Sequence, residues 1–218
     1  MDILITGTVS GIGRATALYF LERGHQVTGL DWMESTISHP AYHHVVADVR
    51  KPEQFPQELK PEILINIAGV QDSGQDIDIN LKGVINVTEK YAFHNERMKA
   101  VVIMGSASAH TGSEFPEYAA SKGGLLAYTK NVANRLAPQA ICNSIDPGGV
   151  LTDLNKCVIE DEKLWNQIME LTPLKRWATP EEIAEWIYFL AVNNRFMTGQ
   201  NLLIDGGEAG NTKFIWPE

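Results

Sequence analysis

The sequence predicts a single α/β domain built on a doubly wound, seven-stranded parallel sheet that is flanked by helices. Short apolar runs alternate along the chain with helix-length periodic segments, which is the order that parallel strands with crossover helices require. The apolar runs are nearly continuous, as expected for strands that are covered on both faces. The 218 residues contain no repeat, low-complexity segment or linker, so residues 1–218 are predicted to form one domain.

The elements can be placed in order along the chain. The predicted strands are Ile3–Thr6, Gln26–Leu30, His44–Ala47, Ile63–Asn66, Ala100–Met104, Ile141–Ile145 and Asn201–Ile204. The predicted helices are Gly11–Arg23, Asn80–Arg97, Tyr118–Leu136 and Pro180–Val192. The last helix has the clearest start, because Thr179 is a favourable N-cap and Pro180 is suited to the first helical position.

Composition excludes several classes of function. The chain is 44% hydrophobic and 21% charged, with a mean hydropathy of -0.14, as in soluble globular proteins. A net charge of -9 and a pI near 5.2 disfavour nucleic acid and anionic membranes as partners. The cysteines Cys142 and Cys157 and the pair His43-His44 match no metal-binding spacing, so no metal is predicted. No leader-like segment and no apolar run of ~20 residues is present, and a cytoplasmic protein is expected.

A glycine-rich turn follows the first predicted strand. Gly7, Gly11 and Gly13 have the spacing G-x-x-x-G-x-G in "TGTVSGIGRA" and open a helix. Such a turn lets backbone N–H groups and the helix N-terminus face a phosphate. A glycine-rich turn alone is weak support for a nucleotide site, but its place between strand and helix favours that interpretation.

An acidic residue stands at the end of the second predicted strand. Asp31 lies 18 residues after Gly13, where a carboxylate can accept hydrogen bonds from a ribose diol. It would repel a 2'-phosphate, and no lysine or arginine lies within Thr8–Ser10 or just after Asp31. The cofactor predicted here is therefore NAD(H), with NADP(H) as the less favoured alternative. The competing interpretation is that Asp31 is a solvated turn residue.

Tyr118 and Lys122 are four residues apart in "FPEYAASKGG", on one face of a predicted helix and among small neighbours. Taken alone, this pattern fits a tightly packed helix equally well. Together with the other motifs it resembles the Tyr-x-x-x-Lys of the short-chain dehydrogenase/reductase family. "TGTVSGIG", "ADV", "NIAG", "NLKG", "DPGGVLT" and "TGQNLLIDGG" resemble further motifs of that family in the same order, over nearly the whole chain.

The resemblance implies a Rossmann fold and an NAD(P)-dependent oxidoreductase that interconverts an alcohol and a carbonyl by hydride transfer. It assigns catalysis to Asn80, Ser106, Tyr118 and Lys122. It assigns cofactor binding to Gly7, Ser10, Gly11, Ile12, Gly13, Asp31, Asp48, Val49, Asn66, Ala68, Gly69, Tyr118, Lys122, Pro147, Gly148, Val150 and Thr152.

In this family the tyrosine is the general acid/base. A phenol has a pKa of ~10, and a lysine ammonium ~4–5 Å away lowers it by about two to three units. That brings the group near the working pH, where acid–base catalysis is most effective. Lys122 is also expected to hydrogen-bond the nicotinamide ribose, and Asn80 to hold a water that links Lys122 to solvent. The alternative for Asn80 is a helix-start residue that bonds the backbone.

The match departs from the family pattern at several points. Ser106 is preferred to Ser108 as the catalytic serine, although its spacing to Tyr118 is one residue short. Ile67 replaces the second asparagine of the family's N-N-A-G. The segments between Asp48 and Asn66 and between Gly69 and Asn80 are shorter than usual, so a helix and a loop near the cofactor are expected to be trimmed.

Other functions compete with an NAD(H)-dependent enzyme. One alternative is an NADP(H)-dependent enzyme of the 3-oxoacyl-[acyl-carrier-protein] reductase type, and another is a non-catalytic dinucleotide-binding regulatory protein. "SASAHT" (Ser106–Thr111) also resembles the corresponding stretch of dihydrodiol dehydrogenases. The substrate is expected to be a small alcohol or carbonyl compound, and the sequence does not choose among these classes.

Two further features are predicted near the end of the chain. Leu154–Trp177 is rich in large apolar residues and is expected to form a substrate lid, the alternative being a surface helix with its apolar stripe on the core. A homo-oligomer, a tetramer or a dimer, is expected from the small residues on the helix Tyr118–Leu136 and from the apolar tail within Glu208–Glu218. The tail alternatively folds back onto its own subunit.

Overall fold

A computed structural model describes residues 1–113 and 115–211 of the chain. The expected apolar tail at Phe214, Ile215 and Trp216 lies outside the described residues. The strands are β1 (Asp2–Thr6), β2 (Gln26–Asp31), β3 (Tyr42–Val46), β4 (Ile63–Asn66), β5 (Ala100–Met104), β6 (Ile141–Pro147) and β7 (Asn201–Ile204). All seven predicted strands are therefore present.

The strands form one parallel sheet in the order β3-β2-β1-β4-β5-β6-β7, which confirms the predicted fold class. The helices are α1 (Gly11–Leu21), α2 (Val84–Tyr91), α3 (Ser108–Thr111), α4 (Pro116–Leu136), α5 (Lys156–Ile159), α6 (Glu162–Leu171) and α7 (Pro180–Tyr188). Two π-helical segments, η2 (Ile77–Gly83) and η4 (Phe189–Asn193), adjoin α2 and α7, and two 3-10 turns are η1 (Pro52–Gln54) and η3 (Asp153–Asn155).

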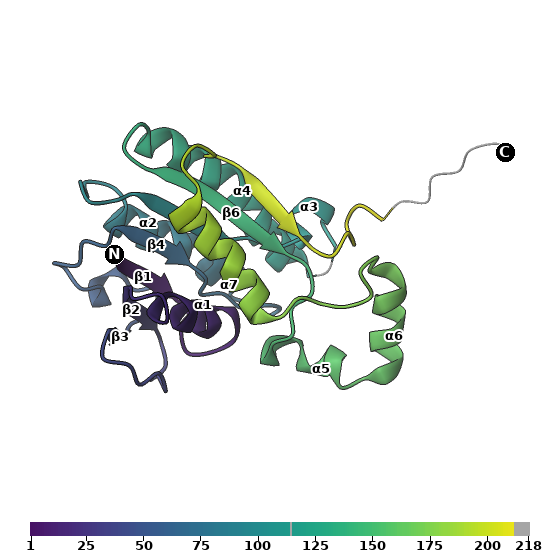
Figure 1. Ribbon diagram of the computed structural model, residues 1–218. Helices are drawn as coiled ribbons and strands as arrows, with labels where there is room; N and C mark the ends of the chain where they lie inside the picture. The colour runs from purple at the N-terminus through teal and green to yellow at the C-terminus, as the bar shows by residue number, and fades with distance from the viewer. Residues whose placement is uncertain (114, 212–218) are drawn as a thin grey trace.

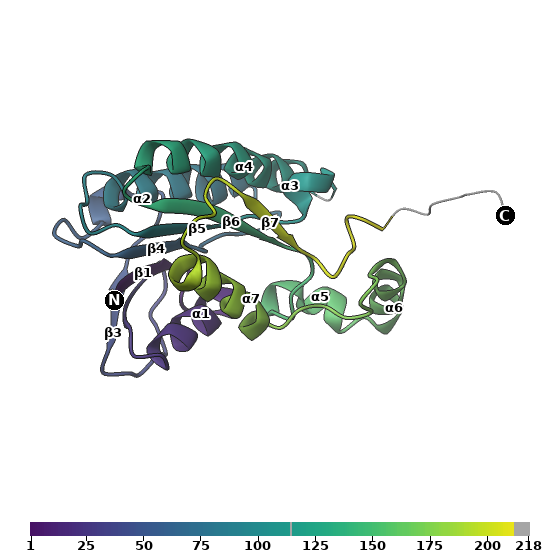
Figure 2. The same cartoon turned by 45° about the horizontal axis from the view of Figure 1, so that its top comes forward.

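Helices cover both faces of the sheet (Figure 1 and Figure 2). Because side chains alternate along a strand, Ile3 and Ile5 of β1 face a core with α1 and α7, while Leu4 faces a second core with α2 and α4. Phe20 of α1 and Leu125 of α4 are fully buried in these two cores. The nearly continuous apolar strands of the sequence are explained by this burial on both faces.

Helix boundaries differ from the prediction where local chemistry decides them. The second predicted helix begins at Ile77, as η2, and ends at Tyr91 rather than Arg97. The chain turns at His94, whose φ is 57°, and Asn95 donates its side-chain amide to the carbonyl of Tyr91 at 3.0 Å. At α7 the predicted cap is confirmed, because the Thr179 side chain accepts from the Glu182 N–H and Glu182 bonds Thr179 in return.

The shortened segment expected between Asp48 and Asn66 is the connection between β3 and β4. This connection contains only the short turn η1 where doubly wound folds usually have a helix. A cavity of about 410 Å³, lined by residues that include Thr28, Val45 and Leu59, lies on this part of the sheet. The shortened connection therefore leaves a hollow beside β2 and β3.

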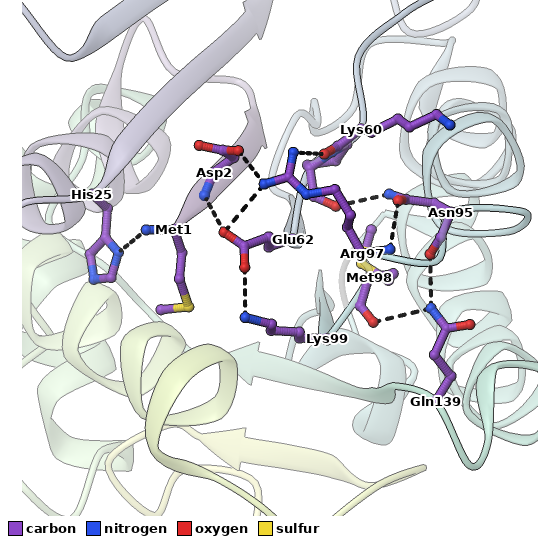
Figure 3. A network of polar contacts seen from close by, with 11 residues as sticks. Met1, Asp2, His25, Lys60, Glu62, Asn95, Arg97, Met98, Lys99 and Gln139 are labelled. Atoms are coloured by element: carbon purple, nitrogen blue, oxygen red, sulfur yellow. Dashed lines mark hydrogen bonds and ion pairs between the residues drawn. The ribbon is translucent and has the colours of Figure 1, made fainter.

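A polar network joins the amino ends of β1, β4 and β5 (Figure 3). Arg97 donates to the carboxylate of Asp2 at 2.5 Å, and Lys99 donates to Glu62 at 2.6 Å. Glu62 also accepts from the backbone N–H of Asp2 at 3.0 Å. Arg97, Asp2 and Lys99 are largely exposed, and only Glu62 is mostly covered, so these ion pairs are expected to contribute little to stability. The opposite, carboxyl edge of the sheet holds the predicted functional residues.

Candidate active site

The strand order reverses between β1 and β4, which is where open parallel sheets bind ligands. Gly7 follows β1 directly, and residues 67–69 follow β4. Gly105 and Ser106 follow β5, while Pro147 ends β6. The parallel arrangement thus brings the separate sequence motifs to one edge of the sheet.

The glycine-rich turn has the shape that a phosphate site needs. Gly7 and Gly11 have φ values of 77° and 50°, which side chains rarely allow. A Cβ at Gly13 would lie 1.8 Å from the carbonyl oxygen of Gly7, so only glycine lets α1 start this close to the turn. Ser10 precedes the helix in an extended conformation, and Ile12 lies in its first turn. The free N–H groups of a helix start can then face an anion.

Contacts between distant segments hold this turn in place. Thr6 accepts hydrogen bonds through Oγ1 from the N–H groups of Ile67 and Ala68, at 3.0 and 3.1 Å. A Cβ at Gly7 would lie 2.8 Å from the backbone of Ala68. A Cβ at Gly11 would lie 3.4 Å from the Thr152 methyl group. The turn therefore meets both the "NIAG" and the "DPGGVLT" segments, and its cradle fits a dinucleotide.

Asp31 is buried at the end of β2, so its interpretation as a solvated turn residue is wrong. Its carboxylate accepts from the backbone N–H of Val9 and from that of Met33, each at 3.1 Å. The carboxylate is thereby fixed beside the glycine-rich turn. A carboxylate has more acceptor positions than these two bonds use, so capacity for a ribose hydroxyl remains.

Three predicted cofactor residues are engaged with the protein itself. Asp48 accepts from Arg50, whose guanidinium lowers the pKa of the Asp48 carboxyl. Val49 packs against Gly83 of η2. Asn66 donates to Thr88 at 3.0 Å, while its buried Oδ1 lacks a partner among the described residues. A cofactor role for these three residues stays a prediction.

The Tyr118–Lys122 pair is assembled on α4. Lys122 is 4% exposed, and its Nζ donates to the carbonyl of Met104 at 2.9 Å and lies 5.8 Å from the centre of the Tyr118 ring. Burial lowers the pKa of Lys122 to about 8, while the charges of Asp146 and Asp76 oppose that shift. The Tyr118 side chain is half-buried. The two side chains are thus close enough for a lysine charge to act on a phenol.

Asn80 is fully buried inside η2. Its side chain accepts from the N–H of Val70 at 2.8 Å, donates to the carbonyl of Val70 at 2.9 Å and donates to Ser121 at 3.2 Å. Asn80 thus bonds the backbone, but it does so from within η2 and not from a helix start, and its role in holding a water stays a prediction. A Cβ at Gly69 would lie 3.0 Å from Asn80 Oδ1 and 3.6 Å from Lys122 Nζ, so both side chains face the same glycine.

The two candidate serines lie together after β5. Ser106 Oγ accepts from the N–H of Ser108 at 3.1 Å, and both side chains are buried. The N–H of Ala107 donates to the carbonyl of Pro147 at 2.8 Å, which joins this segment to the end of β6. Ser106 remains the predicted catalytic serine, because it is the hydroxyl nearest to the strand end.

The sequence analysis missed a buried pair beside these serines. Asp146 is fully buried, and its Oδ2 lies 2.6 Å from His110 Nε2, while Ser144 donates to Oδ1 at 2.8 Å. A Cβ at Gly105 would lie 2.0 Å from Oδ1, so the carboxylate occupies the space of a side chain. The only sequence signal was a buried-strand aspartate before Pro147.

The predicted lid, residues 154–177, contains η3, α5 and α6, which stand apart from the helices that cover the sheet (Figure 1 and Figure 2). Leu154, Leu171 and Leu174 are more than half exposed, whereas Met169 of α6 is buried and Trp165 of α6 packs against Trp177. Trp177 packs on Gly149, and its buried Nε1 lacks a partner within residues 1–113 and 115–211. Closure over a substrate stays a prediction.

Comparison with known proteins gives this site its context. A family model described as enoyl-(acyl carrier protein) reductase matches residues 65–208. The 2,3-dihydro-2,3-dihydroxybenzoate dehydrogenase of Escherichia coli is 31% identical, over 94% of this chain and 96% of its own length. The 3-oxoacyl-[acyl-carrier-protein] reductase FabG of Staphylococcus epidermidis is 29% identical, over 94% of this chain and 97% of its own length. The chain belongs to the short-chain dehydrogenase/reductase family.

Two solved structures of this family are similar over nearly the whole chain. A 4-hydroxyisoleucine dehydrogenase complexed with NADH has a TM-score of 0.89 and is 29% identical, over 97% of this chain and 99% of its own. A protein from Agrobacterium tumefaciens that is assigned as a 2-deoxy-D-gluconate 3-dehydrogenase, with bound NADP, has a TM-score of 0.88 and is 25% identical, over 96% of both chains. The short-chain dehydrogenases/reductases are NAD(P)-dependent enzymes that act on CH–OH or carbonyl groups, and this chain is one of them.

Residues 1–113 and 115–211 contain neither a membrane-spanning helix nor a metal site. No helix there is both long and apolar enough to cross a membrane. No group of three or more histidine, cysteine, aspartate or glutamate side chains there is placed to hold a metal ion.

Proposed function

We propose that this protein is an NAD(H)-dependent oxidoreductase that interconverts a small alcohol and a carbonyl compound with Tyr118 as the general acid/base. The observation that carries the proposal is the placement of Lys122 Nζ 5.8 Å from the Tyr118 ring centre, on the strand edge that also holds the glycine-rich turn. The bound nicotinamide would accept or supply the hydride. The chain's own residues bind the two partners and move the proton.

Tyr118 takes the proton of the alcohol during oxidation and returns it during reduction. A positive charge about 6 Å away, at an effective dielectric near 20, stabilises a phenolate by about 3 kcal/mol. Lys122 supplies that charge as long as it stays protonated, which it does below its pKa of about 8. Ser106 would hold the substrate oxygen, and the buried Asn80 fixes the backbone next to Gly69.

The proposed cofactor preference rests on Asp31. A buried carboxylate that the N–H groups of Val9 and Met33 hold in place suits the two hydroxyls of an NAD ribose. The same charge repels a 2'-phosphate, so NADP(H) is the disfavoured cofactor. The relatives' names include both an NADH complex and an NADP complex, and they leave this choice to Asp31.

The substrate class is best sought among those named for the relatives. We propose a panel of a vicinal dihydrodiol, a hydroxy amino acid, a sugar acid and a 3-oxoacyl thioester, each assayed with NAD(H) and with NADP(H) by cofactor absorbance. Turnover of one class with NAD(H) supports the proposal. Turnover only of the thioester with NADPH would favour the reductase-type alternative, and absence of all turnover despite cofactor binding would favour a regulatory protein.

We also propose that the protein is a homo-oligomer, a tetramer or a dimer. On α4 a Cβ at Gly123 would meet no atom within 4 Å, so this part of the helix is open to a partner. Gly124, by contrast, packs against Leu81 of the same subunit. This internal contact explains why position 124 is a glycine, without any partner subunit. On the other face of the sheet, Trp186 and Phe189 are exposed near α7. Either surface could support assembly.

A further inference from the structure

Two buried carboxylates, Asp146 and Asp76, lie near the catalytic edge, and neither has a role in the function proposed above. Asp146 is 0% exposed and Asp76 is 1% exposed. Charged groups are almost never buried so completely unless they are paired or hydrogen-bonded. Asp146 meets His110 and Ser144, as described above. Asp76 accepts from the N–H groups of Asp72 and Ser73 at 3.0 and 2.9 Å, and also from the Ser73 hydroxyl.

Both carboxylates come from elements that flank the lysine. Lys122 Nζ bonds the carbonyl of Met104, the last residue of β5. The next residue, Gly105, lies against the carboxylate of Asp146. Asp146 belongs to β6, the strand beside β5. Asp76 precedes η2, in the chain that follows β4 on the other side of β5. Asn80 of η2 and Lys122 Nζ both face Gly69, so η2, which Asp76 directly precedes, approaches the lysine on the side away from β6 and Asp146.

Charge links the three side chains. Burial favours the neutral amine and lowers the pKa of Lys122, and the charges of Asp146 and Asp76 act in the opposite direction. Burial likewise raises the pKa of Asp146, whose ionised form is stabilised by His110, Ser144 and the charge of Lys122. Lys122 and Asp146 thus help to keep each other ionised in a site where both are buried.

We propose that Asp146 and Asp76 are the buried counter-ions of Lys122 and act as positioning residues that keep it an ammonium. The inference rests on the proposed function, because the ammonium matters only if it stabilises the Tyr118 phenolate. The other titratable groups that face this cluster are Tyr118, on α4 itself, and His110, which reaches it from α3 through Asp146.

The sign of the effect follows directly. Removing one carboxylate removes a charge that favours the ammonium, so the pKa of Lys122 falls below its present value of about 8. Lys122 is then neutral at a lower pH than before. A neutral lysine no longer stabilises the phenolate, so a higher pH is needed to ionise Tyr118 and to oxidise an alcohol.

A titration of the cofactor-free protein tests the proposal without any substrate. Lysines are labelled with ¹³C at the ε-carbon, and the Lys122 resonance is assigned by its loss in Lys122→Met. The midpoint for Lys122 is expected at about 8 in the unmodified protein. In Asp146→Asn and in Asp76→Asn it is expected to fall by about 1 pH unit. Asp78→Asn, which removes an exposed charge from η2, and Ser144→Ala, which keeps the Asp146 charge, are the matched controls.

Unchanged midpoints in both Asn variants would overturn the proposal, and a change in only one would remove the other acidic residue from it. If Asp146→Asn fails to fold, as judged by thermal unfolding, Asp76→Asn decides the shared claim. A pH profile of alcohol oxidation separates this result from the proposed function. The acidic limb is expected to move to higher pH in the same two variants, with KM for the cofactor unchanged. Suppose that the Lys122 midpoint falls in the two Asn variants but the unmodified protein turns over no substrate. That result would overturn the proposed function and the catalytic role of Tyr118 and Lys122.

Discussion

The Nζ of Lys122 donates a hydrogen bond of 2.9 Å to the backbone carbonyl of Met104, at the end of strand β5. This bond anchors a buried side chain to the rigid sheet, so the lysine is held at a fixed height beside Tyr118. A side chain held in this way suits the two roles proposed for Lys122, beside the Tyr118 phenol and beside a cofactor ribose. The bond also places the ammonium group of Lys122 at the carboxyl edge of the sheet, where the glycine-rich turn follows β1.

Lys122→Ala is expected to damage both turnover and cofactor binding. The substitution removes the ammonium charge, which stabilises the Tyr118 phenolate by about 3 kcal/mol. It also removes the hydrogen-bond donor that is expected to reach the nicotinamide ribose. Turnover should fall by about a hundredfold or more, and the dissociation constant of NADH should rise. Lys130→Ala, an exposed lysine on the same helix, is the control and should change neither. A normal NADH affinity in Lys122→Ala would argue against the ribose contact.

Asp31→Ala is expected to narrow the preference for NAD(H) over NADP(H) by about tenfold, or ~1.4 kcal/mol. The change removes both the acceptor for the ribose hydroxyls and the charge that repels a 2'-phosphate. Asp31→Asn removes the charge but keeps one acceptor oxygen for the N–H of Val9 or Met33. Comparing it with Asp31→Ala shows how much of the cofactor preference comes from charge and how much from hydrogen bonding. Glu34→Ala, a nearby exposed carboxylate, serves as the control. A preference for NADPH in the unmodified protein would overturn this assignment.

Gly13→Ala is expected to abolish cofactor binding and to lower the free energy of unfolding by about 1–3 kcal/mol. The new methyl group would meet the carbonyl of Gly7 at 1.8 Å, and that backbone has to move. Gly123→Ala makes the same change in open space on α4, and it should stabilise the isolated subunit by about 1 kcal/mol. Chemical denaturation and NADH titration check both variants.

The Gly123 variant also reports on assembly. If α4 packs closely against a partner subunit, the added methyl group should reduce the mass measured by light scattering. An unchanged mass would place the interface elsewhere, and the exposed aromatic residues near α7 are then the next candidates.

Much of the fold could be predicted because its signals are local. The seven strands are short apolar runs buried on both faces, and the cap at Thr179 needs only neighbours in sequence. Tyr118 and Lys122 were found together because four residues on a helix bring them to one face. The glycine-rich turn was found for the same reason, since Gly7 and Gly13 meet within one strand–helix turn.

The rest of the site depends on contacts that local patterns do not encode. His110 and Asp146 are 36 residues apart, and their pairing requires β5 and β6 to be neighbours. The side-chain amide of Asn80 bonds the backbone of Val70, and no local pattern predicts that partner. Such contacts follow from strand order and loop length, which one sequence does not supply.

Residues 154–177 are expected to become better ordered when cofactor and substrate bind. The exposed Leu154, Leu171 and Leu174 lack a buried partner surface in the described structure, and a bound substrate would supply one. Hydrogen exchange of α5 and α6 should slow in the ternary complex, while exchange in α7 stays unchanged. Equal protection of α5 and α6 in the free and bound states would count against a lid.

The central claim is that Tyr118 moves the proton, and Tyr118→Phe tests it most directly. The variant loses one hydroxyl and keeps the ring that lies 5.8 Å from Lys122 Nζ. Turnover of whichever alcohol or carbonyl the protein accepts, measured together with NADH affinity on the same preparation, decides the question. The account predicts that turnover falls by about a thousandfold or more while NADH affinity stays within about threefold of the unmodified protein. Near-normal turnover in Tyr118→Phe would contradict it.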